Sequence, residues 1–495
     1  MAAFRRPTAL LCTLVAVGSA LTAAPAEAAS PPPRIDFGRC PASVPDPPGP
    51  ARVECGSVRV PLDRAHPDDE RIRIAVSRVR ASGTPSERRG VLLVNPGGPG
   101  GTGLDYAVTK RAKLPERVRR AYDVIGFDPR GVGHSAPAGC GRMGGHFDAP
   151  GADPVPRDAA AERAYLQGQS AMAGDCARHL GRALPHLSTR ETAHDMDAVR
   201  AALRERRIAY LGVSYGTYLG AAYAAEHPRH AGPMVLDSVV GPWDWHDFDV
   251  RQARALLGQR AVLFGWLARH EGHFGLGGTE GEVRASYARV RGALERRPVD
   301  GFGPAEFDRA VYDALGRTER WQGLGEGLRG FLRSGSVAGL RPESPFSGAE
   351  SRNFEAANRA VKCGDGPGPS PSEVVRDIRG LRSLSSRPVL TGLEATVCAY
   401  WPRGAERTRL GGPAARGALL VTSSHDPVTP RSGALALRPS LPGSRLITLE
   451  NDYSHGVFAS RGNGCVDGAV AAYLLGGRLP ATDKSCEGPG LPRVH

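Results

Sequence analysis

One segment near the middle of the chain constrains the fold most: a strand, a glycine-serine turn and a helix follow one another without a linker. The apolar run 208–211 leads into the pentapeptide Gly212–Gly216, which reads Gly-Val-Ser-Tyr-Gly, and then into the small-residue stretch 217–225. In this context the pentapeptide predicts a nucleophile elbow, because its glycines permit a sharp turn that lifts the serine hydroxyl out of a sheet. The N-terminus of the following helix points at the same hydroxyl. Ser214 is therefore the predicted nucleophile, although an isolated pentapeptide of this kind usually marks an ordinary glycine turn.

Strand patterns alternate with helical patterns on both sides of this segment. An antiparallel edge pair is expected at 58–62 and 71–76, and a helix at 191–206. Strands that alternate with helices indicate a parallel sheet covered on both faces. The predicted fold class is thus α/β, a mostly parallel central sheet flanked by helices, with apolar strands at 91–94, 122–128, 208–211, 233–237, 417–422 and 445–449.

A largely helical block interrupts this pattern. It begins near Gly241 and ends near Thr396, with helical segments at 251–269 and 283–296 and a Gly-Pro stretch at 364–369. An insertion that covers the site is the simplest interpretation. The predicted organisation is a proline-rich lead-in, two parts of an α/β core and an inserted helical cap, at 29–52, 53–240 with 397–495, and 241–396.

The first 28 residues have the pattern of an export signal. Arg5 and Arg6 precede the apolar run 8–24, and Ala26 and Ala28 are small enough for cleavage after Ala28. Beyond this segment no run of about 18 apolar residues occurs, so no membrane association is expected after signal removal. The chain is predicted to be secreted.

Cysteine usage agrees with export. Apart from Cys12 in the predicted signal, eight cysteines are present, an even set that suggests disulfides in an exported chain. Eight cysteines allow 105 pairings, and pairing by proximity in the sequence would join 40 with 55, 140 with 176, 363 with 398, and 465 with 486.

Net charge carries little functional information. The formal charge is +13, and arginine outnumbers lysine 60 to 4. The arginines are dispersed among acidic residues without an aromatic-basic cluster, so no nucleic-acid partner is predicted.

A serine nucleophile needs a base and an acid, which in this architecture follow it in the order acid, then histidine. Asp426 follows the predicted strand 417–422, and His455 follows the strand 445–449. The carboxyl ends of parallel strands meet at one edge of the sheet, where such side chains can converge. Asp237 also follows an apolar strand and is the alternative acid. His425 is interpreted as a loop residue.

A glycine-rich loop, Asn95–Gly103, directly follows the strand 91–94. Acyl transfer needs N–H donors aimed at the developing oxyanion, and glycines let backbone approach it closely. The Tyr215 N–H is the expected first donor, and the N–H of either Gly97 or Gly98 is the second.

The same loop contains Gly98-x-Gly100-x-x-Gly103, a dinucleotide-binding pattern. Pro99 interrupts it, no helix with good propensity is expected to open at Gly103, and the downstream acid and histidine would have no role. No cofactor is therefore predicted. The spacing of His270 and His273 does not match a zinc helix, and no metal is predicted either.

These segments resemble the secreted α/β-hydrolase peptidases of actinomycetes, the tripeptidyl aminopeptidase group, which is related to proline iminopeptidases. The resemblance implies Ser214, Asp426 and His455 as a triad, and it implies that Asp128-Pro129-Arg130-Gly131 shapes the site beside the oxyanion loop. Asn95, His134 and Ser454 depart from residues frequent in proline iminopeptidases. The motifs that carry the resemblance are Asn95–Gly100, Gly126–Ser135, Gly212–Tyr218, Asp426–Pro430 and Ser454–Gly456.

The resemblance also implies peptide or protein N-termini as substrates, with release of short peptides, tripeptides foremost. A buried ammonium needs a paired carboxylate, and Glu355 and Asp365 in the helical block are candidates for binding the substrate amine. Three alternatives stay open: an esterase with the same triad, a non-catalytic binding protein on this scaffold and an oxidoreductase. The sequence leaves the oligomeric state open.

Overall fold

The computed structural model describes residues 34–141, 156–341, 348–384, 393–402, 406–413, 415 and 417–495. The predicted export signal lies outside these residues, as does the start of the proline-rich lead-in. Within the described part of the chain, no helix combines the length and the apolar character needed to cross a membrane.

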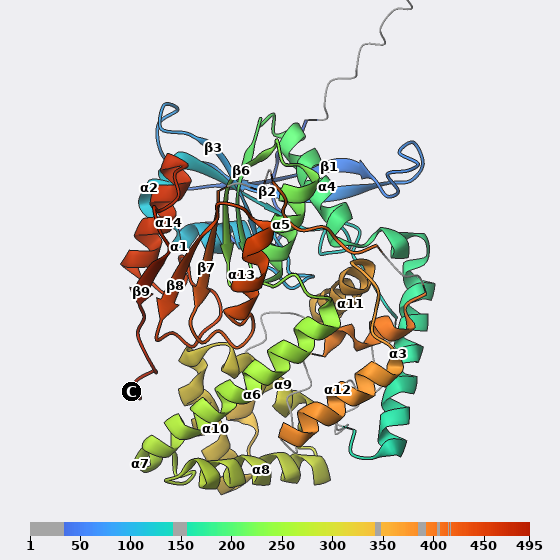
Figure 1. The fold of residues 1–495 in the computed structure, drawn as a ribbon, viewed down its shortest axis with the longest axis vertical. Coiled ribbons are helices and arrows are strands. Elements are labelled where there is room, and N and C mark those ends of the chain that lie inside the picture. The colour runs from blue at the N-terminus through green and yellow to red at the C-terminus, as the bar shows by residue number, and fades with distance from the viewer. Residues whose placement is uncertain are drawn as a thin grey trace, which may run out of the picture. The chain divides into compact units, whose positions relative to one another are not determined.

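A single nine-stranded sheet organises the described residues (Figure 1). Its strand order is β1-β2-β4-β3-β5-β6-β7-β8-β9. The β1–β2 and β2–β4 pairs are antiparallel, and every other pair is parallel. The mostly parallel α/β sheet with an antiparallel edge is thus as predicted. The strands are β1 (Val53–Pro61), β2 (Arg71–Val79), β3 (Gly90–Asn95), β4 (Tyr122–Phe127), β5 (Ile208–Val213), β6 (Ala231–Asp237), β7 (Ala418–Ser423), β8 (Arg445–Glu450) and β9 (Lys484–Glu487).

Helices cover both faces of the sheet, because the central strands are apolar on both sides. Alternate residues of β3 enter different cores: Leu92 and Val94 pack with α1, α2 and α14, whereas Val91 and Leu93 pack on the side of α4, α5 and α13. This is the burial expected of parallel strands. The covering helices are α1 (Leu104–Lys113), α2 (Glu116–Ala121), α4 (Thr189–Ala202), α5 (Tyr215–Glu226), α13 (Ser432–Leu437) and α14 (Gly464–Gly476).

Between β6 and β7 the described residues form helices joined by turns, with one isolated bridge between Val299 and Phe302. Much of this insertion has its own apolar core, in which Trp266, Phe307 and Trp321 are fully buried. The carboxyl ends of β7 and β8 point toward it (Figure 1). Its helices are α6 (Trp245–Arg269), α7 (Glu271–Phe274), α8 (Glu280–Arg296), α9 (Pro304–Leu315), α10 (Trp321–Ser334), α11 (Gly348–Gly364) and α12 (Pro371–Leu384), with 3-10 turns η2 (Thr318–Arg320), η3 (Ala338–Leu340) and η4 (Glu394–Tyr400).

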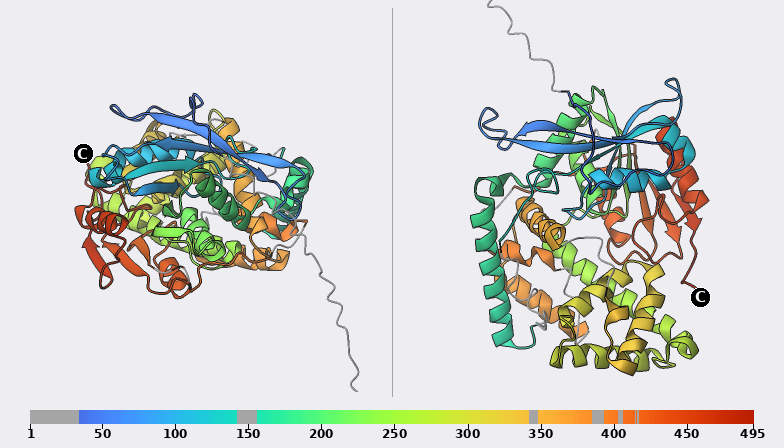
Figure 2. Two further views of the ribbon diagram at one scale, coloured as in Figure 1. Left: turned by 90° about the horizontal axis from the view of Figure 1, so that it is seen from above. Right: turned by 180° about the vertical axis from the view of Figure 1, so that it is seen from behind.

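One helix of the predicted core packs on the insertion. Helix α3 (Ala159–Leu180) runs along the helical block, as the views from the front and from behind both show (Figures 1 and 2). Its Tyr165 hydroxyl lies 3.0 Å from Thr396 Oγ1, and Glu162 accepts two hydrogen bonds from Arg379. Its burial against η4 and α12 is tertiary information that local periodicity does not contain. Two further 3-10 turns are η1 (Gly181–His186) and η5 (Arg438–Ser440).

The four disulfides predicted by proximity are confirmed. They join Cys40 to Cys55, Cys140 to Cys176, Cys363 to Cys398, and Cys465 to Cys486.

Candidate active site

Ser214 occupies a strained turn between β5 and α5. Its backbone has φ 58° and ψ −127°, a conformation that a non-glycine residue holds only when its surroundings enforce it. The flanking glycines are required by contact: a Cβ on Gly212 would lie 2.2 Å from the Gly216 carbonyl oxygen. The Ser214 N–H donates to the Asp237 carbonyl at 2.9 Å. The turn therefore has the backbone geometry of a nucleophile elbow.

The predicted acid and the predicted base lie in contact. Nδ1 of His455 is 2.9 Å from Oδ2 of Asp426 and 3.2 Å from Oδ1. The backbone N–H groups of Val428 and Thr429 each donate to Oδ1 at 2.9 Å, and the Thr429 hydroxyl donates to Oδ2 at 2.9 Å. Burial opposes ionisation of Asp426, but His455 and these donors hold the pKa of its carboxyl below the ordinary value. An ionised Asp426 can retain a proton on Nδ1, which leaves Nε2 of His455 as the basic nitrogen.

Asp237, the alternative acid, holds the backbone on either side of the site. Its carboxylate accepts the N–H groups of Val457 at 3.1 Å and Phe458 at 2.9 Å, just after His455. Its carbonyl accepts the Ser214 N–H. Asp237 thus anchors the histidine segment to the nucleophile turn, while Asp426 contacts the imidazole.

The predicted oxyanion loop packs directly against the Ser214 turn. A Cβ on Gly97 would lie 2.9 Å from Ser214 Cβ and 3.2 Å from the Tyr215 nitrogen. The Gly97 N–H donates to Oδ1 of Asn95 at 3.0 Å. This engagement of the Gly97 N–H favours Gly98 as the second of the two predicted glycine donors. Asn95 is the loop anchor that sequence reasoning missed.

Asp128 fixes the far end of this loop. One of its oxygens accepts the N–H groups of Gly103 and Leu104 at 2.8 and 3.2 Å, and the other accepts the His134 N–H at 2.8 Å. The expectation that no helix opens at Gly103 was wrong, since α1 begins at Leu104. Its cap comes from a carboxylate on the segment after β4 and not from a local side chain, so local propensity could not reveal it.

The two carboxylates predicted to bind an amine have different surroundings. Glu355 follows Phe354, which packs against Gly98 and Gly100 of the oxyanion loop. Its half-buried carboxylate pairs with Arg309 at 3.2 Å and Arg359 at 3.6 Å.

Asp365 is buried, and both of its oxygens are engaged by the chain. They accept the Thr189 N–H and hydroxyl, the Trp245 indole N–H and the Thr408 hydroxyl. Burial raises the pKa of Asp365 to about 6 in spite of these donors. The observed contacts give this carboxylate a structural role, and its amine-binding role stays a prediction.

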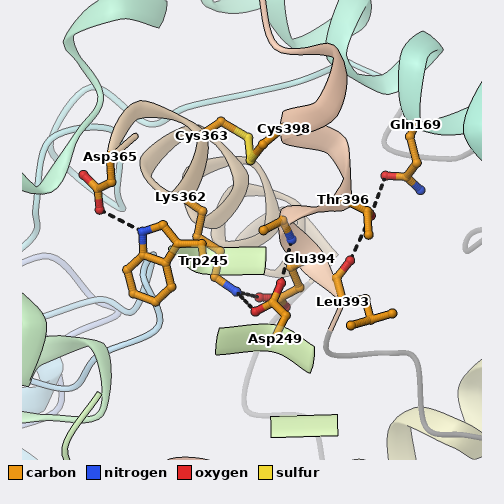
Figure 3. Close-up of a disulfide and its surroundings, with 11 residues drawn as sticks. Gln169, Trp245, Asp249, Lys362, Cys363, Asp365, Leu393, Glu394, Thr396 and Cys398 are labelled. Carbon is orange, nitrogen blue, oxygen red and sulfur yellow. Dashed lines mark hydrogen bonds and ion pairs between the residues drawn. A yellow bond between two sulfur atoms is a disulfide. The ribbon is translucent and has the colours of Figure 1, made fainter. Parts of the chain in front are cut away.

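A buried ion cluster lies beside the Cys363–Cys398 disulfide (Figure 3). Nζ of Lys362 is 2.9 Å from Oδ1 of Asp249 and 2.8 Å from Oε2 of Glu394. Burial disfavours the charged ammonium, but the two carboxylates hold the pKa of Lys362 above its ordinary value. Burial raises the pKa of Asp249 to about 6. Burial also opposes ionisation of Glu394, but Lys362 and the nearby Arg359 hold the pKa of this carboxyl below its ordinary value. The three residues of the cluster come from α6, α11 and η4, and no sequence motif links them.

Among the described residues, one histidine-carboxylate group has donor atoms close enough to hold a metal: Asp197, His227 and His230. It lies where α4 meets the end of α5. Arg200 donates to both oxygens of Asp197, at 2.7 and 3.1 Å, and its positive charge opposes a cation there. We therefore assign no metal to this group.

Residues 90–263 match the family described as alpha/beta hydrolase fold, and residues 388–486 match the family described as TAP-like protein. The chain is 37% identical to a tripeptidyl aminopeptidase of Streptomyces lividans, over 96% of this chain and 90% of that protein.

Two mycobacterial relatives are also similar over most of their length. Serine protease Hip1 of Mycobacterium tuberculosis is 30% identical, covering 91% of each chain. Carboxylesterase B of the same organism is 33% identical, over 88% of this chain and 86% of that protein. The predicted fold class and family resemblance are confirmed, and the chain belongs to the tripeptidyl aminopeptidase-like family of α/β-hydrolases, as a serine hydrolase.

Proposed function

We propose that this chain is a secreted serine exopeptidase that removes short peptides, tripeptides foremost, from free N-termini of peptides or proteins. The observation that carries the proposal is the contact of the Asp426 carboxylate with Nδ1 of His455, on a loop tied through Asp237 to the Ser214 turn. The names of two relatives, a tripeptidyl aminopeptidase and a serine protease, support peptide bonds as the target.

The chemistry follows from the positions of these groups. Nε2 of His455 takes the Ser214 proton as Oγ attacks the scissile carbonyl carbon, and Asp426 stabilises the resulting imidazolium. The N–H groups of Tyr215 and Gly98 bind the oxyanion. His455 then returns the proton to the leaving amine, and an acyl-enzyme remains on Ser214. Water, deprotonated by His455, releases the peptide in the second half of the reaction.

Recognition of the substrate amine needs negative charge near the scissile bond. We propose Glu355 and Glu394 for this role. Glu394 is 29% exposed, while its partners Lys362 and Asp249 are buried. The pKa of Glu394 lies below its ordinary value, because nearby cations outweigh the effect of burial, so its accessible carboxylate is ionised. Glu355 directly follows a residue that touches the oxyanion loop. Both carboxylate oxygens of Asp365 already accept hydrogen bonds from the chain, which supports a different role, that of holding Thr189 and Trp245 in place.

Export is supported by the disulfides. Four disulfides are rare in a reducing cytosol and common in secreted proteins. N-terminal sequencing of the protein recovered from culture medium tests the proposed cleavage after Ala28, and protein found only inside cells would contradict export.

Matched substrates test the activity. Tripeptidyl p-nitroanilides with a free and an acetylated N-terminus, and a p-nitrophenyl ester, are compared for wild type and Ser214→Ala. We expect turnover of the free peptide only by the wild type and poor turnover of the acetylated form. Equal cleavage of both peptides would refute amine recognition. Glu394→Gln is expected to raise KM for the free peptide roughly tenfold, while Glu282→Gln, in the capping box of α8, leaves KM unchanged.

An esterase is the second candidate, because one relative is named carboxylesterase B. Turnover of the ester without turnover of any peptide would favour it. In both cases a fluorophosphonate probe labels Ser214, whereas an unlabelled wild type would favour a non-catalytic binding protein.

A further inference from the structure

The loop that carries His455 is held on two sides, by the sheet core and by the helical insertion. This loop comprises residues 451–461 and follows β8; we call it the histidine loop. Three consecutive residues of it, Gly456, Val457 and Phe458, donate their N–H groups to Ser238 Oγ and the Asp237 carboxylate. The core therefore fixes the segment after His455.

The insertion fixes the three residues up to and including His455. The His455 N–H donates to the Gly316 carbonyl at 3.0 Å, just after α9. The Ser454 hydroxyl lies 2.9 Å from Thr318 Oγ1 and accepts the Thr318 N–H at 3.2 Å. Ser454 is completely buried, so this hydroxyl has no access to solvent.

A third contact comes from a different helix of the insertion. Nε2 of Gln259, on α6, donates to the Tyr453 carbonyl at 2.7 Å and lies 3.4 Å from the Leu315 carbonyl. Gln259 is buried, and it ties the histidine loop to the C-terminal end of α9. We call Gln259, Gly316 and Thr318 the clasp.

The clasp also reaches the loop of the acid. A Cβ on Gly316 would lie 3.2 Å from Cγ2 of Val428, whose N–H donates to Asp426. One segment of the insertion thus contacts the loops that carry the base and the acid. A displacement of this segment would change the position of the imidazole relative to Ser214 and Asp426.

We propose that Gln259, Gly316 and Thr318 position His455, so that correct seating of the insertion sets the rate of acyl transfer as well as access to the site. The inference rests on the proposed triad of Ser214, Asp426 and His455. It assigns these residues a positioning role, exerted through the backbone at 453 and 455 and the Ser454 side chain, without contact with substrate.

The same hydrogen bonds would also be present if they only stabilised the fold. The experiment must therefore separate an effect on the position of His455 from an effect on folding stability. Thr318→Val removes the hydroxyl and keeps the shape, Thr318→Ser keeps the hydroxyl, and Gln259→Met keeps the length without the donor. The matched control is Thr279→Val, which removes a capping hydroxyl from α8 elsewhere in the insertion. All are assayed well below their melting temperatures.

Two readouts are used: the rate constant for phosphonylation of Ser214 by a small fluorophosphonate, and kcat and KM for a tripeptidyl p-nitroanilide. The probe needs the triad but makes no use of peptide-binding residues. We expect Thr318→Val and Gln259→Met each to lower the phosphonylation rate and kcat roughly five- to tenfold, with little change in KM. Thr318→Ser should restore both rates, and Thr279→Val should leave them unchanged.

Unchanged phosphonylation in the Thr318→Val/Gln259→Met double variant would overturn the positioning role, as would an equal loss in Thr279→Val. Failure of the wild type to be labelled at Ser214 would instead overturn the proposed triad, and with it this inference.

Discussion

The close contact between the oxyanion loop and the Ser214 turn makes Gly97→Ala a sharp perturbation. Gly97 has φ +99°, and an added Cβ would lie 2.5 Å from the Val213 carbonyl oxygen, 2.9 Å from Ser214 Cβ and 3.2 Å from the Tyr215 nitrogen. All three neighbours belong to the turn that carries the predicted nucleophile. They are backbone or short side-chain atoms, so none can rotate away.

The size of the effect follows from these distances. Ordinary contacts between such atoms begin near 3.5 Å, so the loop and the turn must separate by roughly 1 Å. A misplacement of that size can cost about 10²-fold in rate, and loss of one oxyanion donor costs about 10²- to 10³-fold. We therefore expect kcat of Gly97→Ala to fall by about 10²- to 10³-fold. The backbone strain at positive φ adds about 1–3 kcal/mol of destabilisation.

Gly335→Ala is the matched control. Gly335 has φ +73° at the C-terminal end of α10, and its added Cβ would meet no atom within 4 Å. It shares the backbone strain of Gly97→Ala but leaves the active site untouched. The assay compares kcat on a tripeptidyl p-nitroanilide and the melting temperature of both variants. A Gly97→Ala protein that keeps more than a third of wild-type kcat would refute the described packing of the loop on the turn.

Three further predictions follow from the buried carboxylates and one disulfide. Asp426→Asn should lower kcat about 10⁴-fold, because the imidazole of His455 loses the partner that fixes its tautomer. Asp237→Asn should lower kcat at most about 10²-fold, because the Asp237 carboxylate accepts only backbone N–H groups. The reverse ranking would make Asp237 the catalytic acid. Burial raises the pKa of Asp365 to about 6 from 3.8, so the folded state holds a proton that the unfolded chain has lost between those values. The stability contributed by this group is therefore present below about pH 4 and lost as pH rises through 6, by about 3 kcal/mol in all. Urea unfolding at pH 4.5 and 7.5 spans about 2 kcal/mol of that loss in the wild type, and Asp365→Asn should lack this component. Replacing Cys363 and Cys398 by alanine should lower the free energy of unfolding by roughly 3–4 kcal/mol, since the disulfide joins residues 35 apart in the sequence. This change should also reduce kcat/KM for peptides more than loss of the Cys465–Cys486 disulfide does, because Lys362 and Glu394 lie beside Cys363–Cys398. Equal effects on kcat/KM would contradict a role for the Lys362 ion cluster in substrate binding.

Local signals explain the parts of the fold that were predicted. The apolar run of β5, the two glycines and the small residues of α5 belong to one continuous segment, so the turn at Ser214 could be inferred without any distant contact. The order of Asp426 and His455 after their strands reflects chain connectivity, which a sequence also contains. The disulfides join cysteines that are neighbours among the cysteines along the chain.

Several features escaped because their causes are remote in sequence. Helix α1 opens at Leu104 since Asp128, on the segment after β4, accepts its first N–H groups. Helix α3 packs on the insertion through contacts with Thr396 and Arg379. No periodicity within either helix reports such partners.

The sequence by itself determined the α/β class, the strained turn at Ser214 and the set of acids and histidines that can reach it, because these follow from local conformation and strand order. The tertiary structure decided which groups meet. It placed Asp426 on the imidazole and Asp237 on the backbone below it, engaged the Gly97 N–H with Asn95, and enclosed Asp365 within four donors. Hydrogen bonds and burial between distant segments govern these choices, and they exist only after the insertion has packed on the sheet.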